Sequence, residues 1–229
     1  MTVPMYRPGL PERPPRMRSL ALNEKGYPVP WFVAWIDGKP EFRAMDPDKW
    51  ERAVKHKLCW LCGEKLGHFQ TFVAGPMCGI NRTSSEPPSH HDCAVYAARA
   101  CPFMTLPKAV RRQAGLPEGV QLAPGQKTTN SGIVGGVSLT RNPGVTMLWT
   151  TTSYMVHKVE NGMLLEMGPP VEVEWYSEGR RATRAEVDES IRTGMPFLRD
   201  LAEAEGERAI AQLERYVQRM QAVLPVTDA

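Results

Sequence analysis

The chain has 229 residues, 42% of them hydrophobic and 23% charged, which is ordinary for a soluble globular protein and excludes a fibrous or largely disordered one. The net charge is +3, but residues 1–115 carry 17 Lys and Arg against 10 Asp and Glu, so the front half is +7 and the back half −4. No apolar run approaches the roughly 18 residues that cross a membrane, and the N-terminus lacks the apolar segment of a secretory signal.

The cysteines and the uneven charge limit the biochemical setting. Five cysteines form an odd set, and two of them lie in a C-x-x-C pattern. In a chain without a recognisable signal peptide this favours reduced thiols and a bound metal over a disulfide framework, so we expect a cytoplasmic protein. The basic front half indicates an anionic partner, although the two halves can also simply attract each other.

Residues 1–20 are the first predicted segment, an arm rich in proline and arginine. Five prolines and four arginines occur in it. Because proline fixes φ and lacks an amide donor, we expect an extended arm rather than a helix or an inner strand. Two roles remain open: a disordered tail, or a basic arm that contacts phosphate or a neighbouring subunit through Arg13, Arg16 and Arg18.

A β-hairpin begins the next predicted segment, a zinc-binding domain at residues 21–115. The strand at 31–36 is apolar on both faces. Asp37-Gly38 follows it, and both residues tolerate the positive φ of a two-residue turn. We therefore expect a return strand directly after residue 38.

A helix then leads into the pattern CWLCG, whose cysteines are Cys59 and Cys62. Asp46 is a favourable N-cap and Pro47 suits the first helical position, so the helix is predicted at about 47–57. Two cysteines with two residues between them, followed by a glycine, present both thiolates to one point. Zinc takes four ligands in a tetrahedron, usually thiolate or imidazole, so a second pair of ligands is needed.

The second ligand pair is predicted at the start of a helix in the stretch SHHDCAVYAARACP. With Ser89 as N-cap the helix starts at His90, which places His90 and Cys93 on one face of its first turn. A thiolate there also faces the positive end of the helix dipole. Between the two pairs we expect a β-hairpin around residues 74–76. The predicted zinc ligands are therefore Cys59, Cys62, His90 and Cys93.

Three further residues, Cys78, His91 and Cys101, can each replace a proposed ligand. Cys78 can also act as a nucleophile, but packing in a core is favoured. Cys101 closes an almost wholly apolar helix and is expected to be buried. His91 lies about 100° around the helix from its neighbour His90, so both cannot easily bind the same ion, and we expect a polar surface residue.

The predicted order of elements resembles that of the treble-clef zinc-finger superfamily. It consists of a turn with two cysteines, a hairpin, and a helix whose first turn carries the second ligand pair. The resemblance covers residues 57–101 and matches at the four ligands just named. It implies a structural zinc ion and a local fold but no particular activity, since treble clefs occur in nucleic-acid binders, nucleases and protein-interaction modules. The whole chain also resembles uncharacterised proteins that bacterial and bacteriophage genomes carry, which implies an accessory, DNA-associated or host-interaction role.

The rest of the sequence predicts a loop and then a second body. A short basic helix contains Lys108, Arg111 and Arg112, and a linker or long surface loop follows at 116–133, rich in Gly, Pro, Ser, Thr and Asn. We expect residues 134–229 to form an antiparallel β-meander packed by C-terminal helices. The predicted fold class is therefore α+β, and the two halves can pack as one body.

Two helices are predicted after the meander. Thr183 and Glu186 form a capping box for the first helix, and Gly194 is expected to stop it. The second, at about 196–224, is amphipathic, with a bend allowed at Gly206. Its apolar face either packs on the meander or forms a homodimer.

The favoured function is a non-catalytic, zinc-stabilised module that binds nucleic acid or another protein. A closed set of four protein ligands contributes folding stability and leaves no open coordination position. With no base-reading motif in the sequence, contacts to DNA or RNA would be mainly to phosphate. The basic residues available for them are Arg13, Arg16, Arg18, Lys108, Arg111 and Arg112.

An HNH-type nuclease is the first alternative, because that family also uses a treble-clef-like frame. His68, Asn81 and His91 occur in the His-Asn-His order of its motif. The family usually has Asp or His before its general-base histidine, whereas Gly67 stands there in this chain. A separate ligand for the catalytic metal is also missing after Cys93, which puts the nuclease in doubt.

A zinc- or cysteine-dependent hydrolase is the second alternative. It would use Cys78 or a metal-bound water, and zinc catalysis needs an open position and a nearby acid or base. Glu64 and Glu86 are the glutamates nearest to the cysteines, and neither lies in a recognised motif. The sequence therefore favours binding over catalysis.

Overall fold

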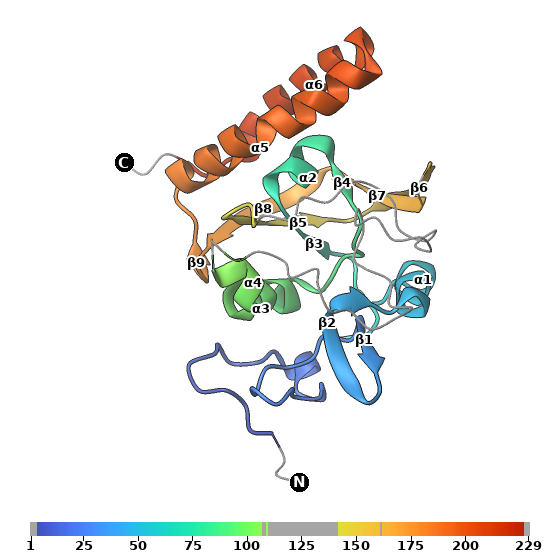
Figure 1. Ribbon diagram of the computed structural model, residues 1–229, viewed down its shortest axis with the longest axis vertical. Coiled ribbons are helices and arrows are strands. Elements are labelled where there is room, and N and C mark those ends of the chain that lie inside the picture. The colour runs from blue at the N-terminus through green and yellow to red at the C-terminus, as the bar shows by residue number, and fades with distance from the viewer. Residues whose placement is uncertain (1–3, 107–108, 110–141, 161, 227–229) are drawn as a thin grey trace.

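The computed structural model describes residues 4–106, 109, 142–160 and 162–226, which form a mixed α and β fold. Six α-helices and three antiparallel sheets make up this part of the chain. Two long helices cover one face of the central strands, and shorter helices, the first hairpin and the N-terminal segment lie on the other side (Figure 1). The predicted linker and the basic residues Lys108, Arg111 and Arg112 lie outside the described residues.

The first hairpin and the first helix agree with the sequence prediction. Strands β1 (Val33–Ile36) and β2 (Lys39–Met45) pair antiparallel, and Asp37-Gly38 between them has φ angles of 48° and 74°. This turn needs positive φ at both residues, which aspartate tolerates and glycine permits. Helix α1 (Pro47–His56) starts at Asp46, whose carboxylate accepts hydrogen bonds from two amides of the first turn.

Two larger sheets each combine strands from both halves of the chain. The four-stranded sheet has the order β3-β5-β8-β9, and the three-stranded sheet has the order β4-β7-β6. Strands β3 and β4 come from the predicted zinc-binding segment, so that segment and the C-terminal strands share their backbone hydrogen bonds. The strands are β3 (Gln70–Ala74), β4 (Thr83–Ser84), β5 (Thr146–Thr151), β6 (Tyr154–Val159), β7 (Gly162–Met167), β8 (Pro170–Ser177) and β9 (Arg180–Arg181).

This strand order corrects the predicted meander. A meander would pair β5 with β6, whereas β5 pairs with β3 and β8, and β6 pairs with β7. All six residues of β5 are buried, because helix α3 (His91–Ala100) packs on one face of its sheet and α2 (Pro76–Asn81) on the other. A strand covered on both faces belongs in the middle of a sheet rather than at the start of a half-exposed meander.

A helix, and not a tight turn, follows β3. The hairpin predicted around residues 74–76 is therefore wrong: Gly75 is the N-cap of α2, and Pro76 occupies the first helical position, which proline favours. Strands β3 and β4 then pair with β5 and β7 instead of with each other. Between the two predicted ligand pairs, β3 and the segment before α3 are joined by an isolated antiparallel bridge from Thr71 to Ser89.

Two antiparallel helices close the described chain. Helix α5 (Arg184–Glu205) begins with the predicted capping box of Thr183 and Glu186 but continues through Gly194, where the sequence predicted a stop. A Cβ on Gly194 would lie 2.8 Å from the sulfur of Met77, so the glycine serves the close packing of α5 on α2. Gly206, with φ of 101°, ends α5.

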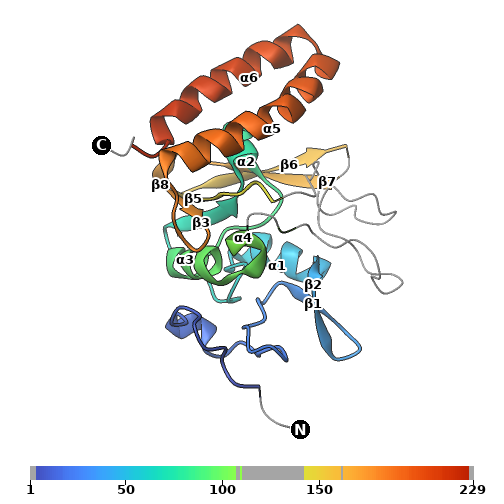
Figure 2. The same cartoon turned by 60° about the vertical axis from the view of Figure 1, so that its left-hand side comes forward.

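Helix α6 (Glu207–Met220) then runs back along α5, so residues 196–224 do not form the single helix that was predicted, although the chain breaks at Gly206, where a bend was allowed (Figure 2). Three large apolar residues of the pair, Leu198, Leu213 and Met220, are buried in the main hydrophobic cluster. Packing on the body therefore uses that face, and a homodimer through these helices stays a prediction. None of the described helices is both long enough and apolar enough to cross a bilayer.

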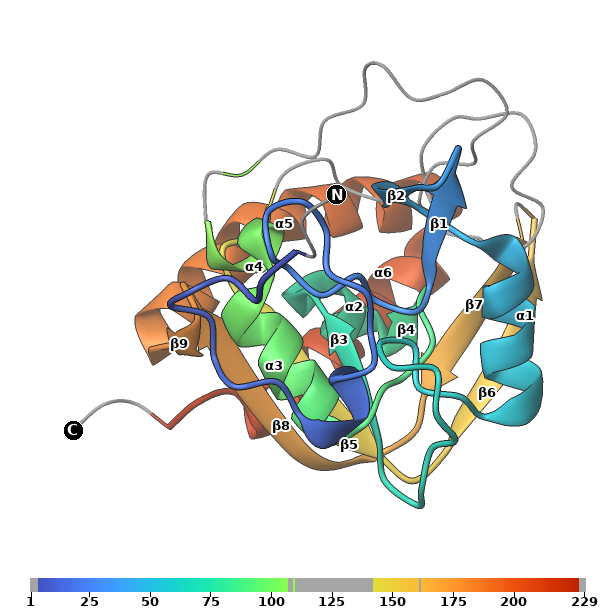
Figure 3. The same ribbon diagram turned by 90° about the horizontal axis from the view of Figure 1, so that it is seen from below.

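The N-terminal segment lies across the side of α3 that faces away from β5 (Figure 3). It is irregular apart from a 3₁₀ turn, η1 (Pro15–Met17). Met17 is 2% exposed, and Tyr6, Leu10 and Leu20 pack around the same small cluster. The segment, with Met17 in its 3₁₀ turn, thereby packs against the cysteines Cys59, Cys62 and Cys93.

Candidate metal centre

The first two predicted ligands, Cys59 and Cys62, lie in a tight turn directly after α1. The amide of Gly63 donates to the carbonyl of Cys59 at 2.8 Å, and the amide of Cys59 donates to the carbonyl of Glu64 at 2.7 Å. Gly63 has φ of 80°, and an added Cβ would lie 2.7 Å from the ring of Trp31. The glycine after the C-x-x-C pattern is therefore needed for both the turn and its packing.

The other two predicted ligands come from the start of α3. His90 is the N-cap, and the helix begins at His91, one residue later than predicted, with Cys93 in its first turn. Ser89 exchanges two backbone hydrogen bonds of 2.8 Å with Thr71 of β3. Strand pairing thus fixes the residue before His90 and positions the helix start.

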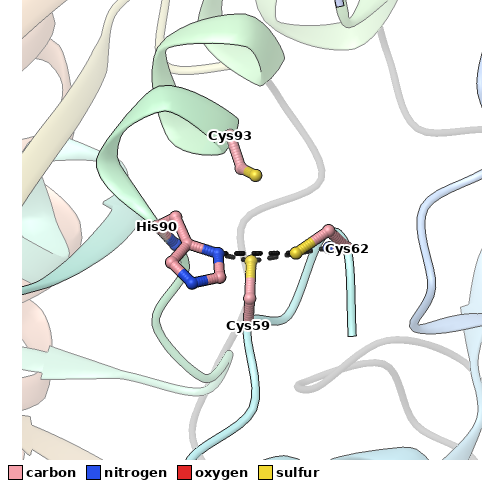
Figure 4. Close-up of side chains that lie close together, drawn as sticks. All are labelled: Cys59, Cys62, His90 and Cys93. Carbon is pink, nitrogen blue, oxygen red and sulfur yellow. Dashed lines mark hydrogen bonds between the residues drawn. The ribbon is translucent and has the colours of Figure 1, made fainter. Parts of the chain in front are cut away.

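The structure brings these four side chains together. All four ligand atoms lie within 4.8 Å of one another, and Sγ of Cys62 is 3.4 Å from Nδ1 of His90 (Figure 4). Tetrahedral zinc with its usual bond lengths separates a sulfur and a nitrogen ligand by about 3.5 Å, and two sulfurs by about 3.8 Å. The cluster therefore has the size that one metal ion of this kind requires.

Hydrogen bonds around the cluster orient its ligands. The backbone amides of Cys62 and His90 each donate to Sγ of Cys59 at 3.4 Å. On the far side of the imidazole ring, Nε2 of His90 lies 3.1 Å from the carbonyl oxygen of Lys65. A histidine that donates Nε2–H to a carbonyl leaves Nδ1 unprotonated for a metal, and such outer contacts are typical of metal-binding histidines.

The cluster also shifts the pKa values of its own members. Burial raises the pKa of Cys59, but hydrogen bonds from Cys62, Cys93 and His90 outweigh burial and lower it. Hydrogen bonds to Cys59 and Cys62 raise the pKa of Cys93, and the same two sulfurs raise the pKa of His90 to about 10. Without a cation Cys93 and His90 thus retain their protons, because a further negative sulfur beside that of Cys59 is unfavourable. A divalent cation supplies the charge that lets them deprotonate.

Arg16, one of the arginines that the sequence predicts to contact phosphate, is a neighbour of the cluster. Its guanidinium lies 2.9 Å from the carboxylate of Asp92, in the first turn of α3, and 3.8 Å from that of Glu64, beside the cysteine turn. The pKa of Arg16 is raised, chiefly by Asp92, with Cys93 and Glu64 adding to it. The acidic residues beside both ligand pairs were the signal in the sequence that could have identified this contact.

Arg13 and Arg18, the other two arginines of the N-terminal segment that were predicted to contact phosphate, also have partners within the chain. Arg18 contacts the carboxylate of Glu12 at 2.8 Å, and Arg13 lies over the ring of Tyr6, 4.8 Å from its centre. The hydroxyl of Tyr6 is 2.9 Å from that of Tyr96 in α3. The segment predicted to contact phosphate is therefore bound to the module itself.

The residues that could have replaced a ligand lie outside the cluster. Cys78 is in α2, where burial raises the pKa of its thiol, and Cys101 is half-buried between α3 and α4 (Pro102–Thr105). His91 turns toward the sheet, and its Nε2 lies 2.6 Å from the buried carboxylate of Glu174 in β8. Its partner is thus a carboxylate and not a metal.

The residues of the alternative nuclease motif lie on three separate elements. His68 is exposed in the loop before β3, Asn81 ends α2, and His91 starts α3. No hydrogen bond between described residues joins any two of them, and the candidate metal cluster includes none of them.

The four residues can hold an ion and thereby tie the cysteine turn to α3. Comparisons with models of protein families, with curated proteins and with solved structures found no match to this chain.

Proposed function

We propose that the chain is a non-catalytic binding module whose front part is built around a structural zinc ion. The observation that carries this is the closed cluster of Cys59, Cys62, His90 and Cys93, with all ligand atoms within 4.8 Å. Three thiolates and one imidazole suit zinc, and four protein ligands leave no position for a reacting water. In such a site the metal contributes folding free energy rather than chemistry.

The local fold is proposed to be a reduced treble clef. The cysteine turn and the ligand-bearing start of α3 occur in the order of that superfamily, and the amide of Trp60 donates to the carbonyl of Pro88 at 3.1 Å, between these two parts. In place of a full hairpin, this chain has the Thr71–Ser89 bridge, widened by α2 and β4. The inserted elements join the finger to the two sheets, which supports a scaffold role.

A protein is the partner that the exposed surface favours. Trp35 and Phe42, on the β1–β2 hairpin, are 48% and 44% exposed, and these two strands pair with no other described strand. Aromatic side chains are enriched at the centres of protein–protein interfaces. Arg16 and Arg18 already contact carboxylates of the chain, which lessens the case for phosphate contacts.

Metal content is the direct test of the zinc site. Elemental analysis of the purified chain is expected to give one zinc per molecule, and Cys59→Ser is expected to lose it. Cys78→Ser is the matched control, because that thiol lies outside the cluster and should leave the metal in place. One zinc retained by Cys59→Ser, or a metal-free chain with the module intact, would contradict the site.

The kind of partner is tested by titrating labelled duplex and single-stranded DNA and RNA at two salt concentrations. If a protein is the partner, no tight nucleic-acid binding is expected. Binding that weakens with salt, and that replacement of Arg13, Arg16 and Arg18 by glutamine abolishes, would instead establish the phosphate-contact version of the module.

A further inference from the structure

A hollow of about 170 Å³ lies where the α2–β4 junction meets the start of β6 and the end of β7. It is lined by Arg82 from the α2–β4 junction, by residues 153–155 at the start of β6, and by residues 166–169 at the end of β7. These elements lie side by side in Figure 1. No zinc ligand contributes to this hollow.

Arg82 is fixed in place but has no anionic partner. It ends α2 in the left-handed conformation with φ of 55°, and its carbonyl accepts the amide of Met167 at 2.7 Å. Its guanidinium carbon lies 5.5 Å from the ring centre of Trp149. Arg43 and Arg180 contact carboxylates, whereas Arg82 forms neither an ion pair nor a side-chain hydrogen bond with any described residue.

The walls of the hollow are held by hydrogen bonds of their own. The indole N–H of Trp149 donates to the carbonyl of Gly168 at 2.9 Å, and the amide of Gly168 donates to the carbonyl of Ser153 at 3.0 Å. The hydroxyl of Thr151 donates to the carbonyl of Pro169 at 2.9 Å. A Cβ on Gly168 would lie 2.5 Å from the oxygen of Ser153, so these segments are closely packed. Such a site is formed before any ligand arrives.

The lining contains two charged side chains, those of Arg82 and Glu166, and they do not form an ion pair with each other. The carboxylate of Glu166 lies 2.6 Å from Nε2 of His157, so its contact is with the imidazole and not with Arg82. The hydroxyl of Tyr154 has no hydrogen-bond partner among the described residues, and burial raises its pKa, so it stays protonated as a donor. Met155 adds apolar surface to the lining.

We propose that this hollow binds a small organic anion, a carboxylate or a phosphate monoester, whose oxygens pair with the guanidinium of Arg82. The planar fork of arginine matches the oxygens of both groups, and an unpaired fork held against an aromatic ring is ready for that contact. A cavity of about 150 Å³ accommodates a ring of the size of benzene, so the ligand is limited to about one ring and its anionic group. Its apolar part would lie against Met155 and Pro169.

Titration of the full-length, ¹⁵N-labelled chain with benzoate and phenyl phosphate tests this site, with benzyl alcohol as the neutral analogue. The indole N–H signal of Trp149 and the Nε–H signal of Arg82 report on it directly. At least one of the two anions should shift these signals. The anion that binds with the lower Kd shows whether the site prefers a carboxylate or a phosphate monoester. Benzyl alcohol should bind at least about tenfold more weakly, because it lacks the charge-assisted hydrogen bonds.

Arg82→Gln is expected to weaken anion binding about tenfold or more. Arg219→Gln is the matched control, since Arg219 lies with Arg82 in a neighbouring cavity of about 20 Å³ but does not line the larger hollow. Arg82→Lys, which keeps the charge without the fork, and Tyr154→Phe, which loses only the hydroxyl, should each weaken binding a few-fold. Equal binding of benzyl alcohol, no binding of either anion, or full affinity in the Arg82 variants would overturn the proposal.

Discussion

The two largest of the three hydrophobic clusters among the described residues differ in size and in composition. The larger has sixteen buried residues drawn from the sheets and from helices on both of their faces, and Trp149 and Phe72 within it are at most 2% exposed. The smaller has nine buried residues between the N-terminal segment, the cysteine turn and α3, and three of them are Cys59, Cys62 and Cys93. The larger cluster consists of apolar side chains, whereas the smaller cluster packs around the thiols of three cysteines.

This difference indicates where each region obtains its stability. Apolar burial grows with the size of a core, so the larger cluster can be stable through packing alone. We expect a cluster of nine residues with thiols at its centre to depend on a cross-link through a bound metal. Trp60 connects the two, because it lies between the cysteines in sequence but stacks on Phe32 and belongs to the larger cluster.

Removal of the metal by a chelator should have the largest effect and should separate the two regions. The stability of the smaller cluster is expected to fall by an amount on the order of several kcal/mol, since metal-binding free energy is folding free energy in such sites. Hydrogen exchange measured by mass spectrometry should show lost protection at residues 59–66 and 90–100 and retained protection in β5 and β8. Uniform loss across both regions would mean that they are one cooperative unit.

A cavity in the larger cluster should produce the opposite pattern. Leu165 in β7 is fully buried, and Leu165→Ala is expected to cost about 2–5 kcal/mol in urea unfolding while the zinc content stays the same. Leu201→Ala is the matched control, because Leu201 in α5 is 39% exposed and should change stability by less than about 0.5 kcal/mol. Loss of zinc from folded Leu165→Ala protein would show that the two clusters are not independent.

The two regions also differ in how far the sequence could predict them. The ligand set rests on local rules: the spacing of Cys59 and Cys62, the glycine after them, and the placement of His90 and Cys93 one turn apart at a helix start. The Asp37-Gly38 turn and the capping box of Thr183 and Glu186 follow from equally local rules, and the structure confirms them.

Features that depend on distant partners were not predictable in the same way. The central position of β5 arises because β3, from the front half, pairs with it, and no pattern within residues 145–159 indicates that partner. Gly194 looked like a helix stop, but its role is to let α5 approach Met77 of α2, a contact across more than a hundred residues. The partners of Arg16, Asp92 and Glu64, are likewise distant in sequence, and no pattern within residues 1–20 selects them over phosphate.

Acid should weaken the start of α5 through Glu186. Its ion pair with Arg180 and its hydrogen bonds with Thr183 lower the pKa of Glu186 to about 2, from an ordinary value of 4.5. A depressed folded-state pKa adds stability that is present above about pH 4.5 and is lost as the pH falls toward 2. Glu186→Gln should therefore cost about 1 kcal/mol at neutral pH and progressively less below pH 4.5.

Urea unfolding followed by far-ultraviolet circular dichroism at several pH values measures that difference. Glu189→Gln is the control, because Glu189 lies in the same helix but pairs with Arg192 on the exposed surface and takes no part in the cap. A cost for Glu186→Gln that does not change between pH 7 and pH 3 would assign the effect to packing rather than to the charge of the carboxylate.

The smallest expected effect concerns Arg16, and it tests whether the N-terminal segment belongs to the metal-centred region. Its side chain and that of Asp92 are 42% and 41% exposed, so Arg16→Gln should lower stability by less than about 1 kcal/mol, and less at high salt.

The effect of Arg16→Gln should be clearer in the rate at which a chelator removes zinc. Three thiolates and one Zn²⁺ leave a net negative centre, which the nearby guanidinium stabilises, so Arg16→Gln should release zinc faster. Arg18→Gln loses only an exposed contact with Glu12 and should release zinc at the parent rate. Equal release rates for both variants would show that Arg16 does not stabilise the metal centre.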